Sequence, residues 1–225
     1  MRVEPRFRIQ QLLTRWAIYF VGLIVMSFGI VLTIKADFGS APWDVLHVGL
    51  YLQFGLTIGT WSIIVGLIVL ALSATITKSL PQLGAFINML MVGLFIDMFM
   101  MLPFLKTPGL LPGKIMMLVI GILIMGYGMG LYISARCGAG PRDSLMIALT
   151  DRTRWKVQYI RGVMEVIVLF VGWLLGGPVF LGTVIFSLTI GTIVGFTLPH
   201  CQLLSDSIVR KAGKEESIQI NHFSN

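Results

Sequence analysis

A duplicated segment constrains this chain more than any other feature of its sequence. Residues 29–50 (GIVLTIKADFGSAPWDVLHVGL) return 99 positions later as residues 128–149 (GMGLYISARCGAGPRDSLMIAL), with nine of 22 residues identical. Both copies contain Gly-x-x-Pro-x-Asp, a polar and helix-breaking pattern that the lipid-exposed part of a membrane protein tolerates poorly. A match in such a pattern indicates a genuine internal repeat.

The composition places both copies in a membrane. Hydrophobic residues make up 56% of the chain, charged residues only 12%, and the mean hydropathy is +0.89, which is too apolar for a soluble domain. About 20 apolar residues span a bilayer as a helix. Such runs occur at residues 16–34, 57–76, 83–104, 115–134, 160–176 and 179–198. We therefore expect an all-α polytopic protein with six transmembrane helices, embedded in the lipid bilayer.

The distribution of Lys and Arg predicts the orientation. With the N-terminus in the cytoplasm, twelve of the 17 Lys and Arg residues lie inside and two, Lys106 and Lys114, lie outside, as the positive-inside rule requires. The other three, Lys35, Arg136 and Arg142, lie in the repeated segments. Both termini are then cytoplasmic, and the net charge of +7 needs no nucleic-acid partner. The expected organisation is a basic segment 1–15, a first membrane repeat 16–104, an extracytoplasmic loop 105–114, a second repeat 115–204 and a cytoplasmic tail 205–225.

Three spans per half is an odd number, so the two halves are expected to enter the bilayer from opposite sides. The third spans support this pairing, because residues 84–93 match residues 182–191 at Gly84/Gly182 and Gly93/Gly191. Inverted repeats of this kind recur in secondary transporters, whose sites lie near the membrane midplane on interrupted helices.

The repeated motif is expected to interrupt a helix. Its residues are Gly39, Pro42 and Asp44 in the first copy and Gly138, Pro141 and Asp143 in the second. The glycine permits a sharp turn, the proline suits the first position of a helix, and the carboxylate favours the first turn. The expected helices at 42–53 and 141–150 are roughly 18 and 15 Å long, too short for a core of about 30 Å.

We therefore expect two re-entrant or broken helices, one after the first span of each half, whose starts flank one central cavity. The alternative is that both helices lie flat at the interface, with Asp44 and Asp143 acting only as helix-start residues.

Ionisable residues inside spans are costly and indicate function by default. Asp97 and Glu165 are the costliest acids, because they lie within predicted spans. We favour a functional role for Asp97 over a structural ion pair with Arg142 or Arg136. Glu165 follows Arg161 by four residues, so a structural same-face ion pair is the favoured interpretation there.

Arg142 and His47 complete the candidate substrate-binding residues. Arg142 stands beside Asp143 at a predicted helix start, where it could form an anion site or balance a buried carboxylate such as Asp97. His47 follows Asp44 by three residues and could serve as a proton relay. Because two ligands make a poor metal site, we expect no metal and no cofactor. No hydrolase, nucleotide-binding or redox motif occurs, so we expect no enzyme activity.

The motifs GSAPWDVL and GAGPRDSL, with third spans that begin GAFIN and GTVIF, resemble the YczE/YyaS/YitT group of bacterial integral membrane proteins. The resemblance covers roughly residues 15–200. It implies a multi-pass protein of the bacterial cytoplasmic membrane, and it supplies no substrate or catalytic residue.

The leading functional hypothesis is a transporter or channel for a small solute or ion. The alternative is a non-transporting accessory or regulatory membrane protein in which the repeats only solve a packing problem. A homodimer is compatible with six short spans.

Overall fold

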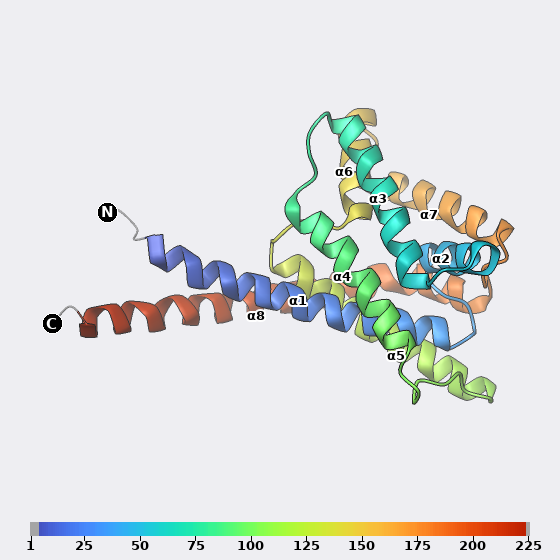
Figure 1. Cartoon of the computed structure of the whole chain (residues 1–225), viewed down its shortest axis with the longest axis horizontal. Helices are drawn as coiled ribbons and strands as arrows, with labels where there is room; N and C mark the ends of the chain where they lie inside the picture. Colours follow the sequence, from blue (N-terminus) through green and yellow to red (C-terminus); the bar gives the residue numbers. More distant parts are fainter. Residues whose placement is uncertain (1–4, 224–225) are drawn as a thin grey trace.

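The computed structural model describes the backbone of residues 5–223 and the side chains of residues 9–213. Within that range all regular structure is helical (Figure 1). The helices are α1 Pro5–Lys35, α2 Pro42–Phe54, α3 Ile58–Thr77, α4 Leu83–Met100, α5 Leu111–Ser134, α6 Pro141–Thr153, α7 Val157–Leu174 and α8 Leu181–Phe223. Four of the cations counted as cytoplasmic lie outside the described part: Arg2 and the side chains of Arg6, Arg8 and Lys214.

Six of the helices are long and apolar enough to cross a membrane. They are α1, α3, α4, α5, α7 and α8, and each overlaps one predicted span. The predicted all-α fold with six spans is therefore confirmed. Helix α8 continues through Pro199 as far as Phe223, so the segment expected as a polar tail extends the last span as helix.

The two short helices repeat the same backbone path. Each has 13 residues and a proline in its first turn. The turn before α2 has positive φ at Asp37 (49°) and Gly39 (102°), and the turn before α6 has it at Arg136 (57°) and Gly138 (142°). Glycine adopts such angles at little cost, which explains why both copies of the motif keep it.

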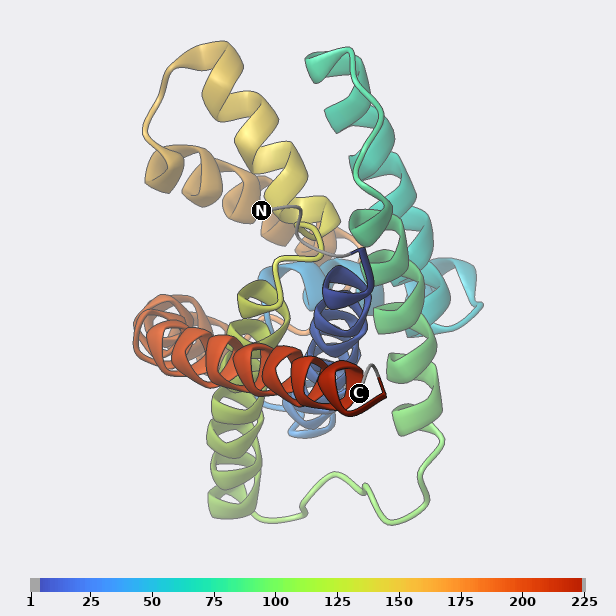
Figure 2. The same cartoon turned by 90° about the vertical axis from the view of Figure 1, so that its left-hand side faces the viewer.

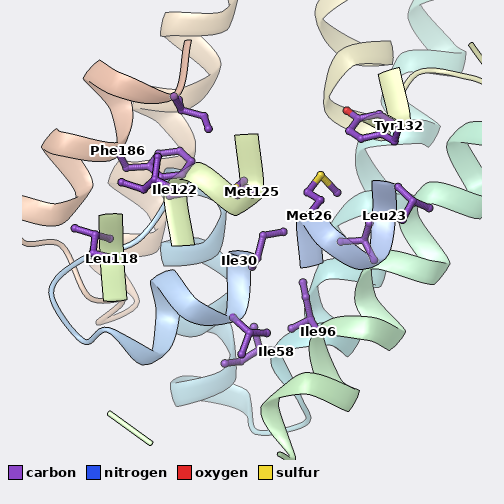
Figure 3. Close-up of a cluster of buried hydrophobic side chains, with 14 of the residues drawn as sticks. Leu23, Met26, Ile30, Ile58, Ile96, Leu118, Ile122, Met125, Tyr132 and Phe186 are labelled. Carbon is purple, nitrogen blue, oxygen red and sulfur yellow. The ribbon is translucent and has the colours of Figure 1, made fainter. Parts of the chain in front are cut away.

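Helices α1 and α5 cross closely at the centre of the molecule. A Cβ atom on Gly29 would collide with the backbone of Met125, and one on Gly128 would collide with the backbone of Met26. These contacts are reciprocal, because Met26 and Met125 also occupy equivalent places in the repeat. These glycines therefore permit close packing of the two helices, and Figure 3 shows both methionines in the buried core around the crossing.

The two halves exchange their short helices (Figures 1 and 2). Helix α2 packs against α7 of the other half, and α6 packs against α3. The carbonyl of Phe38 accepts a hydrogen bond from Gly182 N at 2.8 Å, and the carbonyl of Cys137 lies where a Cβ on Gly84 would sit. The turn before each short helix thus docks on the start of the last span of the opposite half. The halves interlock and do not form separate domains.

Candidate functional site

A cavity of about 120 Å³ lies between the starts of α2 and α6. Both copies of the motif line it, as the repeat predicts. The lining motif residues are Ala41, Pro42, Trp43 and His47 at the start of α2, and Gly140, Pro141, Arg142 and Asp143 at the start of α6. Both short helices begin with proline and have no side-chain cap, so their N-terminal backbone ends receive no side-chain hydrogen bond.

Most of the remaining cavity wall is apolar and adaptable. Six methionines line it, contributed by the core helices, α4, α6 and α7: Met26, Met89, Met125, Met129, Met146 and Met164. Tyr132, Phe186 and Ile190 add further apolar surface. Methionine side chains are flexible and polarisable, so this wall can adjust to the shape of a small apolar group.

Asp44, His47 and Arg142 form a charged cluster beside the cavity. Asp44 and His47 are 1% and 2% exposed. Oδ1 of Asp44 lies 3.8 Å from His47 Nδ1 and 3.9 Å from Arg142 Nη2, distances that are too long for hydrogen bonds. Neither carboxylate oxygen of Asp44, nor His47 Nδ1, has a hydrogen-bond partner among the described residues. Burial of an under-bonded carboxylate is costly, so this cluster is unusual for a purely structural one.

Arg142, from the second motif, reaches Trp43 and Asp44 of the first motif. Its guanidinium lies 4.8 Å from the centroid of the Trp43 ring, in a cation-π contact, and it donates no hydrogen bond to a described residue. The side chain keeps 35% of its surface exposed at the cavity. The structure places Arg142 within ion-pair distance of a buried carboxylate, and this carboxylate is Asp44 and not the Asp97 named from the sequence.

Asp143 has a different environment from Asp44, its equivalent in the first motif. Its Oδ2 accepts a hydrogen bond from the buried Tyr132 hydroxyl at 3.0 Å. Asp143 therefore has a hydrogen-bond partner within the protein, whereas Asp44 has none among the described residues.

Asn88 of α4 also faces the cavity, although it was not among the candidates drawn from the sequence. It is 6% exposed, and its Nδ2 donor has no partner among the described residues. A polar amide inside an apolar span was the available signal, because such residues usually hydrogen-bond across helices.

Two other candidates belong to structural contacts. The Asp97 carboxylate accepts hydrogen bonds from the Thr57 hydroxyl and from Gly59 N, the latter at 2.8 Å, at the start of α3. Asp97 therefore caps a neighbouring helix and is not among the cavity-lining residues. Glu165 accepts a hydrogen bond from Arg161 at 3.0 Å, and this confirms the predicted same-face pair.

The apolar helices define a polytopic helical membrane protein. The chain belongs to a family described as a family of unknown function (DUF6198), whose model matches residues 13–199. It is 43% identical over 205 residues to the "uncharacterized membrane protein YczE" of Bacillus subtilis strain 168, covering 90% of this chain and 94% of that protein.

Two further relatives extend this likeness. An uncharacterized protein of Haemophilus influenzae is 34% identical over 182 residues, covering 81% of this chain and 82% of its own length. The uncharacterized protein YyaS of Bacillus subtilis is 27% identical over 175 residues, covering 76% of this chain and 86% of its own length. The resemblance to the YczE and YyaS group is therefore confirmed. No solved structure matches the chain significantly.

Proposed function

We propose that this protein is a transporter of a small solute, with its binding site in the cavity between two inverted repeats near the membrane midplane. One observation carries the proposal: the duplicated motif contributes both of its copies, one from each half, to a single cavity, and an under-bonded charged cluster lies beside that cavity. Inverted repeats with interrupted helices around a central site are the architecture of many secondary transporters.

Energetics supports transport over a packing role. Burial of an ionisable residue within a membrane protein costs free energy. A carboxylate without hydrogen bonds does not contribute to packing that would offset this cost. The proposed location is the bacterial cytoplasmic membrane with both termini in the cytoplasm, because the loops that carry Lys78 and the run from Arg152 to Lys156 then lie inside. The proposed activity involves no chemical conversion of the solute.

Water access to the cavity tests the proposal. Ser62 lines the cavity, whereas Ser73, on the same helix α3, is buried away from it. In a background where Cys137 and Cys201 are replaced by Ala, we expect a small hydrophilic thiol reagent to label Ser62→Cys and not Ser73→Cys.

A screen of solutes by thermal shift then identifies the chemical class. A ligand that binds only the native protein raises its apparent melting temperature by mass action. Labelling of neither cysteine variant, together with no stabilising solute, would favour the accessory or regulatory alternative.

A further inference from the structure

We infer that the cavity takes a small organic monoanion, such as a short carboxylate, together with one proton, because the solute and Asp44 compete for Arg142. This inference rests on the proposed transport function and specifies the substrate class and its coupling.

Unused hydrogen-bond donors converge on the cavity. Arg142 lines the cavity with its side chain 35% exposed, Asn88 offers a buried Nδ2 without a partner among the described residues, and the starts of α2 and α6 are uncapped. Helix N-termini and guanidinium groups both favour negatively charged oxygen atoms. Because the buried Asn88 donor is independent of the helix ends, the donor set is complementary to a carboxylate.

The charges of the cavity limit the solute to one negative charge. Arg161 is already paired with Glu165, and Asp143 keeps a second carboxylate at the cavity, because its partner Tyr132 donates only a neutral hydroxyl. Arg142 is therefore the cation that remains for a ligand among the described cavity residues. The methionine-rich wall suits an apolar body, and the volume of about 120 Å³ suits a small one.

Asp44 links anion binding to a proton. Its Oδ1 lies 3.9 Å from Arg142, so an ionised Asp44 partly neutralises the cation that the solute needs. Two carboxylates that share one cation in a buried site do not both stay ionised. When the solute binds Arg142, a hydronium ion of the bulk solvent therefore gives one proton to a carboxylate oxygen of Asp44 and becomes water. The anion and the proton enter together, and the net charge moved is zero.

The other titratable groups around Asp44 come from several elements. His47 lies on the same helix, with its Nδ1 3.8 Å from Asp44 Oδ1. The others line the cavity from neighbouring helices: Arg142 and Asp143 from α6, Tyr132 from α5, and Arg161 and Glu165 from α7. Of these, His47 is the competing candidate for the proton, because it is the residue that ordinarily titrates near neutral pH. The experiment must therefore separate Asp44 from His47.

Butyrate binding to the purified full chain tests the inference, with the uncharged butyramide as control. Butyrate stays ionised between pH 6 and 8, so a change in affinity reports on the protein. We expect butyrate to raise the melting temperature and butyramide to have no effect. We also expect the affinity for butyrate to fall by up to about tenfold for each unit by which the pH rises, because one proton is taken up with each anion.

Matched variants assign the roles. Asp44→Asn should still bind butyrate, but the binding should no longer depend on pH or take up a proton. His47→Gln should keep the binding, its pH dependence and the proton uptake. Arg142→Gln should lose binding at every pH, and Arg142→Lys reports whether a cation without the guanidinium fork is enough. The size-exclusion profile of each variant checks folding.

Three outcomes would overturn the inference: equal stabilisation by butyramide, loss of the pH dependence in His47→Gln instead of Asp44→Asn, or no response to butyrate. If other solutes in the broad screen stabilise the protein, only the anion class fails and the transport proposal stands.

Discussion

Asp44 and Asp143 occupy equivalent places in the two motifs and differ in their hydrogen bonding. Tyr132 donates its hydroxyl to Asp143, whereas Thr33, the residue equivalent to Tyr132 in the first half, donates to the carbonyl of its own helix at Ile30. Asp44 thus lacks the hydroxyl that its counterpart has. This difference makes the site asymmetric although the backbone repeats.

The first prediction follows from that difference. Asp143→Asn should destabilise the protein by about 1.5–3 kcal/mol, since it weakens a hydrogen bond to a charged group. Asp44→Asn should leave stability unchanged or raise it, because it removes a buried charge that accepts no hydrogen bond from a described residue. Thermal unfolding in one detergent compares the two variants. A larger loss for Asp44→Asn would show that its ion pair with Arg142 is structural.

The second prediction concerns Asp97, which contacts the start of α3. Asp97→Ala should lower the free energy of unfolding by about 1–3 kcal/mol, because the Thr57 hydroxyl and Gly59 N lose their acceptor. It should not change solute binding. A double-mutant cycle with Thr57→Ala should give non-additive stabilities, and additive effects would contradict the capping role.

At the scale of elements, the turn before each short helix is held by a glycine of the opposite half. Gly84 and Gly182 lie at equivalent positions, and each approaches a carbonyl, that of Cys137 or Phe38. The repeat also pairs Gly93 with Gly191. A Cβ on Gly191 would have no described atom of another segment within 4 Å, whereas one on Gly93 would collide with Ile63. The identical glycines therefore make equivalent contacts at Gly84 and Gly182, and not at Gly93 and Gly191.

The third prediction uses this contrast. Gly84→Ala and Gly182→Ala should each cost about 1–3 kcal/mol, because the added methyl group collides with backbone of the docked turn. Gly191→Ala is the matched control on α8 and should be neutral or slightly stabilising, since Ala favours helix over Gly by up to about 1 kcal/mol. Thermal unfolding of the three variants measures this. Equal losses at all three positions would remove the docking contact as the cause.

At the scale of the whole molecule, ion pairs lie at both ends of the α1 and α5 pair. Lys114 binds Asp37 at 2.6 Å. In the repeat, Arg15 is equivalent to Lys114 and Arg136 is equivalent to Asp37, so both residues are cations and cannot pair with each other. Instead, the carboxylate of Asp206 on α8 lies 3.9 Å from Arg15 and 3.5 Å from Arg136. The long last helix therefore supplies the carboxylate that the second copy lacks.

The fourth prediction concerns topology. In a background without native cysteines, single cysteines at Thr107 and Phe180 should react with an impermeant reagent from outside the cell. Cysteines at Ser79 and Thr153 should react only after permeabilisation. The positive charges beside Ser79 and Thr153 set this expectation. Labelling of Thr153→Cys in intact cells would contradict both the orientation and the inverted arrangement.

The sequence by itself determined the six spans, the two short helices and their glycine turns. These features depend on hydrophobic length and on local backbone preferences, which neighbouring residues along the chain express directly. It also indicated Asp44, Asp143, Arg142 and His47, because polar residues in a duplicated membrane motif are conspicuous.

Only the tertiary structure decided the partners of these residues. In the structure Arg142 lies beside Asp44, Asp97 contacts the start of α3, and Asn88 lines the cavity. Arg142 meets Asp44 because the two halves exchange their short helices, whereas Asp97 meets the start of α3 because α4 packs against α3 within the first half. Both contacts join residues far apart in sequence. Spacing along one chain segment carries no information about which opposite helix will face it.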